Sequence, residues 1–350
     1  MTGTTMSMTS ETVFEKFIDG QDETAWNEAL GELLSSIHEV DKTATQIWFA
    51  FYPLGLFRAL HEAEDPQLLA SRLLLQGKYL LRDQIDSSHK FLYGHRYWPE
   101  VKRAVAQYAA SFDGSAKLPL ADQIRKVAHM VAESLKVEDS LVLGITAVAF
   151  MTITQTGVEA FTAEPGTVSI DRKYARKSAQ QVLEERAKDD SQGLFGFLRT
   201  VDKQWTVTYD EESNASFKLI QEEELASASA RDTSCDWRAV DQRCIEGPIP
   251  VECRSASCGT CWVGVLGGAE KLTEVAALEG KQVKEFGYLN TDVPQPIIRL
   301  ACQARGTGAV SIVIPPWNGV FGKYLRAKQS RQPEEVMSRS GSNGGGESGQ

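Results

Sequence analysis

CRSASCGTC, residues 253–261, holds three of the six cysteines of this 350-residue chain. Its thiols, Cys253, Cys258 and Cys261, follow a C-x4-C-x2-C spacing, and Cys302 follows about forty residues later in RLACQA. Most residues between the thiols are small, namely Ser255, Ala256, Ser257, Gly259 and Thr260. Small residues let a loop fold tightly and direct several backbone N–H groups at sulfur. The stretch therefore predicts a loop that presents thiolates to an inorganic centre.

The spacing is typical of a 2Fe-2S cluster, in which each iron takes two thiolates. A structural zinc site also uses four thiolates, but it is usually built from two C-x2-C pairs, and this chain has one. Disulfides require an oxidising compartment. Residues 1–10 are rich in Thr and Ser and lack the basic and apolar regions of a signal peptide. The cluster is the interpretation that we favour over both alternatives.

With these motifs, the C-terminal part resembles the plant-type 2Fe-2S ferredoxins and the ferredoxin domains of larger redox proteins. The resemblance lies within residues 203–322 and runs from about Trp205 to Ile314; Gly247, Ile249-Pro250 and Leu272-Thr273 add to the two cysteine motifs. It implies a β-grasp fold, in which a small mixed sheet packs on a helix. It also implies a 2Fe-2S cofactor held by Cys253, Cys258, Cys261 and Cys302, with a redox partner docking near the cluster loop.

Local patterns in this part agree with a small sheet. Alternating or β-branched runs predict strands at 205–209, 217–220, 262–266 and 310–314. We expect a helix over Asp232–Ile245, although this stretch is poor in apolar residues, and an insertion between Glu270 and Pro296, because the gap to Cys302 is longer than in the plant ferredoxins. Trp262 has two interpretations: an aromatic that shapes partner docking, or a strand residue that covers the core.

The predicted fold class is α+β: an all-α helical bundle followed by the β-grasp domain. Composition shifts predict these segments: 1–10 disordered, 11–188 all-helical, 189–202 linker, 203–324 ferredoxin-like and 325–350 a disordered tail. Within the helical part, an apolar stripe runs from Trp26 to Ile37, Asp65-Pro66 predicts a capped helix start, and Pro99 predicts another. Helices are also expected at 122–135 and 140–161, and the charged stretch 171–188 predicts a solvated helix.

Composition narrows the class of partner. The net charge of -10 argues against a nucleic-acid partner and suits a carrier that docks on a basic protein surface. The most apolar run, Leu141–Ile153, is shorter than the roughly 20 residues of a membrane span, so we expect a buried helix and no transmembrane segment. With no leader recognised at 1–10, we expect a cytoplasmic location.

All five histidines lie in the helical part: His38, His61, His89, His95 and His129. None shows the Glu-x-x-His or His-x-x-x-His spacing of a helical metal site, so we interpret them as surface or core residues. HKFLYGHRYW, residues 89–98, is nevertheless the stretch where a cofactor or partner of this part would be sought.

The sequence thus predicts a one-electron carrier with no catalytic residues of its own, in which the helical part docks a reductase or oxidase. Two alternatives stay open. The ferredoxin domain could feed electrons to a second cofactor or substrate site in the helical part, as an oxidoreductase component, although no G-x-G-x-x-G follows a strand. The cluster could also serve a redox-sensing regulator, with Cys235 or Cys244 as accessory thiols.

Overall fold

The computed structural model describes residues 12–114, 118–188, 203–287 and 295–328. The chain forms two compact units that do not follow its linear order. Unit 1 comprises the chain up to Leu54, then Leu80–Lys188 and Thr208–Ser216, and unit 2 comprises Gly55–Tyr79, Asp189–Val207 and the chain from Phe217 onward. The predicted linker 189–202 and terminus 1–10 lie outside the described residues. The predicted domain boundaries stay a prediction, and residues 325–328, which we assigned to the tail, are helical.

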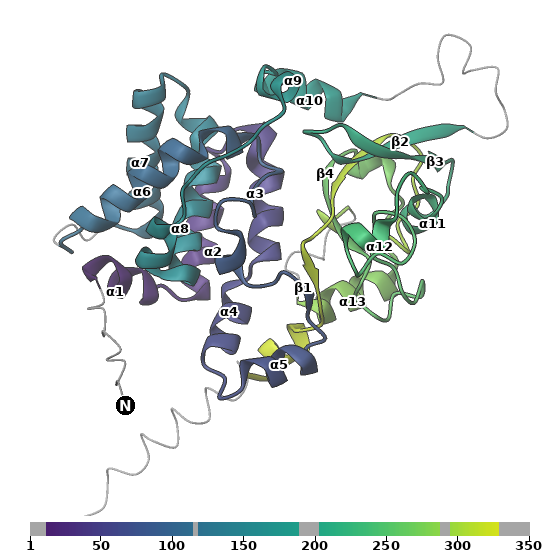
Figure 1. The fold of residues 1–350 in the computed structure, drawn as a ribbon, viewed down its shortest axis with the longest axis horizontal. Helices are drawn as coiled ribbons and strands as arrows, with labels where there is room; N and C mark the ends of the chain where they lie inside the picture. Colours follow the sequence, from purple (N-terminus) through teal and green to yellow (C-terminus); the bar gives the residue numbers. More distant parts are fainter. Residues whose placement is uncertain (1–11, 115–117, 189–202, 288–294, 329–350) are drawn as a thin grey trace, which may run out of the picture. The chain divides into compact units, whose positions relative to one another are not determined.

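Unit 1 is helical. Its α-helices are α1 (Val13–Asp19), α2 (Glu23–Leu34), α3 (Glu39–Phe51), α6 (Trp98–Ser111), α7 (Leu120–Leu135), α8 (Asp139–Ala163), α9 (Arg172–Ala175) and α10 (Ala179–Ala187), with 3-10 turns η1 (Leu81–Gln84) and η2 (Tyr93–Tyr97). In Figure 1 α8 runs through the centre of this group, where it contacts α1, α2, α3, α6 and α7. A helix surrounded in this way is expected to be apolar on every side.

Helix α8 has the length and apolar composition of a membrane span, and it is the one such helix within the described ranges. Most of its apolar window, 72%, is buried inside the protein, as in the core helix of a globular fold. Gly157, with φ of 78°, interrupts the helix near its C-terminal end. The prediction that this run forms a buried helix is therefore confirmed.

The helix starts predicted from the sequence are mostly confirmed. In α5 (Pro66–Arg72), proline occupies the first turn and the Asp65 carboxylate accepts a hydrogen bond from Leu68 N at 2.9 Å. The stripe at 26–37 lies in α2 except for Ile37, because the helix ends at Leu34, and the Pro99 start lies in α6. The charged stretch 171–188 differs, because it is two helices: the Ser178 side chain accepts from Gln181 N and starts α10 anew.

Unit 2 is built on a five-stranded sheet of order β3-β2-β6-β4-β5. The strands are β2 (Gln204–Asp210), β3 (Ala215–Ile220), β4 (Trp262–Gly267), β5 (Ile298–Leu300) and β6 (Val310–Val313). Strand β4 pairs antiparallel with both β5 and β6, and its residues are almost all buried. The four predicted strands are therefore confirmed, and the fold is the predicted mixture of a helical N-terminal region and a C-terminal sheet. The β-grasp assignment itself stays a prediction.

The helix predicted over Asp232–Ile245 is wrong. Helices occur instead at α11 (Leu225–Ala230) and, briefly, α12 (Trp237–Val240). The side chains of Asp232 and Asp236 accept hydrogen bonds from the backbone N–H groups of Ser234 and Ala239. Such local bonds favour turns and helix starts over a continuous helix. The expected insertion contains α13 (Ala277–Phe286) and a 3-10 turn, η4 (Ala269–Lys271).

A segment from the N-terminal half belongs to unit 2. It contains most of α4 (Leu54–His61), all of α5 and the short strand β1 (Gln76–Gly77). Strand β1 pairs antiparallel with β7 (Trp317–Asn318) as a separate two-stranded sheet. Lys78 N also donates to Pro316 O at 2.9 Å. Sequence order alone therefore does not separate the residues of the two units.

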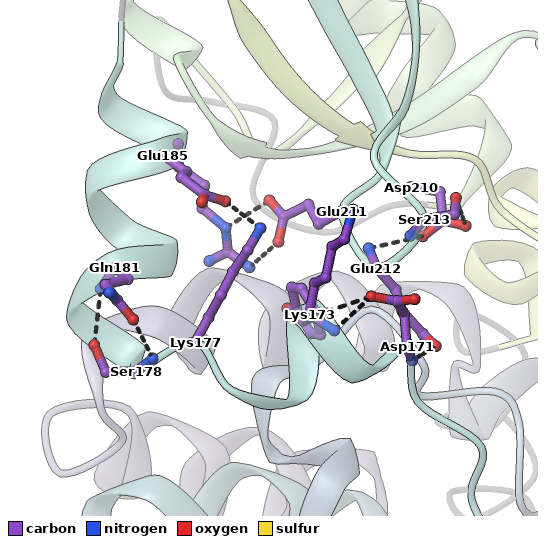
Figure 2. Close-up of polar contacts among 12 residues, drawn as sticks. Asp171, Lys173, Lys177, Ser178, Gln181, Glu185, Asp210, Glu211, Glu212 and Ser213 are labelled. Carbon is purple, nitrogen blue, oxygen red and sulfur yellow. Dashed lines mark hydrogen bonds and ion pairs between the residues drawn. The ribbon is translucent and has the colours of Figure 1, made fainter.

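The turn between β2 and β3 belongs to unit 1, where charged side chains hold it (Figure 2). The buried Arg186 guanidinium of α10 donates to both carboxylate oxygens of Glu211, at 2.7 and 2.9 Å. It also donates to Val40 O at 2.6 Å. Glu212 accepts from Asp171 N at 2.8 Å, at the start of α9. Bidentate pairing of arginine with a carboxylate is the strongest geometry for such a bond.

Candidate metal centre

Two of the predicted thiols lie at the same edge of the sheet. Cys261 directly precedes β4, and Cys302 follows β5 by two residues. Because the strands are antiparallel, with Trp262 opposite Leu300, the start of β4 adjoins the end of β5. Ala301 N donates to Cys261 O at 2.8 Å and fixes this meeting point. The sheet register thus brings Cys302 to the cluster loop across forty-one positions of sequence.

The loop 253–261 turns its amides toward its own sulfur. Arg254, Ala256 and Gly259 have φ of 50°, 60° and 74°, so left-handed residues alternate with ordinary ones. Alternation of this kind makes successive N–H groups converge on an anion. Ser255 N and Ser257 N each donate to the Cys253 sulfur at 3.4 Å. The small residues identified in the sequence are therefore needed where the backbone closes on sulfur.

Gly259 is required for a second reason. A Cβ atom at this position would lie 3.0 Å from the Phe286 ring, which packs on the loop from α13. Together with its positive φ, this tight contact makes any residue larger than glycine strained at this position.

Electrostatics divide the four thiols into two pairs. In the first pair, burial opposes ionisation of Cys253, but hydrogen bonds from Ser257 and Ser255 lower the pKa of this thiol to about 6. Burial raises the pKa of its neighbour Cys258. In the second pair, a hydrogen bond with Cys261 lowers the pKa of Cys302 to about 7, whereas the same contact and burial raise the pKa of Cys261. The easily ionised thiols are Cys253 and Cys302, the first and last of the four candidate ligands in sequence.

These pairs fit a centre with two irons. A zinc site needs its four ligands around one point, whereas each iron of a 2Fe-2S cluster needs two thiolates. The donors present, four thiols with convergent amides, fit the two-iron group.

Comparison with known families agrees with this geometry. Residues 221–307 match the family model described as a 2Fe-2S iron-sulfur cluster binding domain. This part of the chain is a 2Fe-2S cluster binding domain. It contains all four cysteines of the loop and of RLACQA, and its cofactor is the 2Fe-2S cluster. Searches of curated proteins and of solved structures found no match to the chain.

Further residues of the domain support the strand end that carries Cys302, and the sequence analysis missed them. Glu279 of α13 and Arg299 of β5 form a fully buried bidentate ion pair, with N–O distances of 2.9 and 3.0 Å. Glu279 also accepts from Leu300 N at 2.9 Å, and Arg299 donates to Thr273 O at 2.8 Å. The one available signal was the charged first residue of RLACQA, Arg299, within an otherwise apolar strand.

The other candidate residues lie elsewhere. Cys235 is exposed, and the buried Cys244 thiol donates to Pro248 O at 3.3 Å. Trp262 is fully buried, which supports the core interpretation over docking. His89 and His95 meet inside unit 1, with their Nδ1 atoms 2.9 Å apart. His38 accepts from Val40 N, His61 stacks on Phe57, and His129 pairs with Asp139 at the surface.

Proposed function

We propose that Cys253, Cys258, Cys261 and Cys302 hold the 2Fe-2S cluster in a β-grasp domain and that the protein carries single electrons between partner proteins. The observation that carries the proposal is the meeting of Cys302 with the loop at one sheet edge, within a matched cluster binding domain. The bound cluster supplies reversible uptake of one electron. The strand order β3-β2-β6-β4-β5, with helices packed beside it, supports the β-grasp assignment.

In this proposal the loop residues tune the charge on sulfur. The amides of Ser255 and Ser257 donate toward Cys253, and the Gln303 side-chain amide lies 3.6 Å from the Cys302 sulfur. Hydrogen bonds to thiolates stabilise negative charge, which grows when an electron arrives. The polypeptide therefore sets how readily the electron is taken up.

A docking surface for the redox partner is proposed on the stretch before the loop. Val240 and Ile245 are large apolar side chains that are 71% and 56% exposed. The half-buried Asp232 and the exposed Asp236 and Glu246 surround them in sequence, and the chain carries a net charge of -10. Exposed apolar residues with an acidic rim fit a partner that presents a basic face, since opposite charges steer fast encounters.

The test is anaerobic purification of the full-length protein, followed by visible absorption and low-temperature EPR after reduction with dithionite. The proposal expects two irons and two sulfides per chain and an EPR signal that integrates to one spin per chain. Zinc without iron would refute the proposal, and so would a cluster that takes no electron from dithionite.

A specific feature of unit 1 favours a second candidate, an oxidoreductase component with its own site in the helical part. A cavity of about 510 Å³ is lined by residues that include Arg82, Asp86 and Glu164. The Asp86 carboxylate pairs with the buried Lys102 ammonium at 3.1 Å and accepts from Trp98 Nε1 at 2.8 Å. A cavity with a few convergent polar and charged groups is typical of substrate or cofactor sites. A second chromophore, or a bound small molecule in the full-length protein, would favour this candidate.

A further inference from the structure

Four aromatic side chains form a layer beneath the cluster loop. Trp262 follows Cys261, and its ring meets Trp317 edge to face, with centroids 5.7 Å apart. Trp317 in turn lies 5.4 Å from the Phe321 ring. Phe321 N donates to Phe286 O, and the Phe286 ring packs where Gly259 leaves space in the loop. All four rings are buried. We name this set the aromatic layer; its members are Trp262, Phe286, Trp317 and Phe321.

Backbone hydrogen bonds join a segment from much earlier in the chain to the residues on either side of Trp317. We name residues 73–79 the strap; they follow helix α5 and include β1. Gly77 pairs with Trp317 and Gln76 with Asn318. Beyond this ladder, Lys78 N donates to Pro316 O at 2.9 Å, and Val320 N donates to Leu73 O at 2.8 Å. The strap therefore supplies backbone partners on both sides of Trp317 in sequence.

The same stretch around β7 is bonded to the approach to the cluster loop. The largely buried Arg243 guanidinium donates to Asn318 Oδ1 at 3.1 Å and to Pro315 O at 3.0 Å. It also donates to both carboxylate oxygens of Asp241. Residues 315–318 are thus held by the strap and by the segment that leads to Cys253.

Glycine at position 77 permits this close pairing. Its φ is 87°, and a Cβ atom there would lie 2.4 Å from Pro316 O. Such a distance is far inside contact range, so any larger residue must separate the strap from Pro316. Position 77 therefore offers a substitution that opens the pairing and changes no residue near the thiols.

We propose that the strap is a positioning element of the cluster binding domain: it holds Trp317 against Trp262 and keeps water from the Cys261 end of the cluster. The inference rests on the proposed ligand role of Cys261. In this proposal residues 73–79 belong to the protein environment of the cluster, although in sequence they lie among the helices of the N-terminal half. Burial and hydrogen bonding around the ligands control solvent access to a metal centre and its potential.

The test uses the full-length protein with Gly77→Ala and, as a matched control, Gly31→Ala. Gly31 lies in α2, and a Cβ atom there meets nothing within 4 Å. Cluster loss is followed by visible absorption under anaerobic conditions in excess EDTA. We expect Gly77→Ala to lose the cluster at least tenfold faster than wild type, and Gly31→Ala to match wild type. Trp317→Leu should resemble Gly77→Ala, and Trp317→Phe should lie between them and wild type.

Amide hydrogen exchange supplies a readout that does not depend on the cluster. Gly77→Ala should speed exchange at the Lys78 and Val320 amides, whose hydrogen bonds join the strap to residues 316–320, and leave the helices of unit 1 protected. Faster exchange with unchanged cluster loss would overturn the inference, as would wild-type cluster loss in both Gly77→Ala and Trp317→Leu. A wild-type protein that binds no cluster would instead defeat the proposed ligand set, while the exchange result would still show whether the strap is held as described.

Discussion

The cluster loop in unit 2 and the histidine pair in unit 1 both bring reactive side chains together, but by different means. In the loop, three thiols lie within nine consecutive residues, and two amides of the same loop donate to the Cys253 sulfur. Cys302 joins these thiols at a sheet edge. In unit 1, His89 and His95 contact each other through Nδ1, and His89 packs on the Trp98 ring with centroids 3.9 Å apart. Both histidines are buried.

This difference shows when the spacing of reactive residues along a sequence can be interpreted as a cofactor site. The loop spacing is fixed by the cofactor, because each iron needs two thiolates and the backbone must close on sulfur. The His-x5-His spacing crosses an irregular stretch and η2, and no ligand geometry demands it. Local sequence therefore identified the first group, whereas the second becomes visible only when the chain is folded.

The largest effect is expected from removal of a thiol. Cys302→Ser should abolish the stable 2Fe-2S cluster, because one iron would lose half of its protein ligands. The measurement is iron content with visible absorption after anaerobic purification. Cys235→Ser is the control and should keep the full signal, since this exposed thiol lies outside the site. Full cluster content in Cys302→Ser would exclude this cysteine as a ligand.

A smaller loss is expected when the support behind Cys302 is broken. Glu279→Gln leaves the buried Arg299 guanidinium without a charged partner, and such changes destabilise folding by about 3 kcal/mol or more. Urea unfolding of the full chain measures the effect on unit 2. The exposed Glu270, changed to Gln, serves as the control and should stay within about 0.5 kcal/mol of wild type. Equal midpoints for the two variants would show that the buried pair adds nothing.

The histidine pair predicts acid sensitivity of unit 1. Burial, with a smaller effect of the Lys90 charge, lowers the pKa of His95 from 6.5 to about 4. The folded state then holds a neutral ring that the unfolded chain protonates, so stability is full above pH 6.5 and is lost as the pH falls toward about 4. The shift corresponds to a loss on the order of 3 kcal/mol. Unfolding followed by circular dichroism across this range should show a weaker acid loss in His95→Gln.

Asp41 acts in the opposite direction and sharpens this test. Burial raises its pKa from 3.8 to about 6, against hydrogen bonds from Gly94 N and Tyr93 N and the charge of Arg186. As the pH falls through about 6, the folded state takes up a proton at Asp41 before the unfolded chain does, and this uptake stabilises the folded state. The stabilisation is lost as the pH rises above about 6. Asp41→Asn should steepen the acid loss of unit 1. An unchanged pH profile in both variants would contradict the assigned roles.

The smallest effect concerns the loop hydroxyls. A hydrogen bond from Ser257 helps to lower the pKa of Cys253, although burial opposes it. Ser257→Ala should destabilise the reduced cluster relative to the oxidised one by about 1 kcal/mol and make the reduction potential more negative. A dye-mediated potentiometric titration measures the shift. Ser234→Ala, at an exposed serine outside the loop, should leave the potential unchanged, and an equal shift there would remove the case for Ser257.

Several features of the fold were predictable because their causes are local. The Asp65-Pro66 cap and the Trp26–Ile37 stripe specify helix starts and faces through neighbours within one or two turns. The alternation at 205–209 and 310–314 specifies strands in the same way. The prediction of a helix at 232–245 was wrong because aspartate side chains there accept hydrogen bonds from nearby backbone amides, and these bonds compete with helix formation.

The sequence by itself determined the cofactor, since four thiols at a metal-imposed spacing and small residues between them leave little other chemistry. Tertiary structure decided what surrounds it. The buried pair of Glu279 with Arg299, the aromatic layer and the strap at 73–79 join residues that are separated by twenty to more than two hundred positions. Such contacts depend on sheet register and packing, which leave no periodic trace along the chain. For that reason the cofactor could be predicted from the sequence, and its protein environment could not.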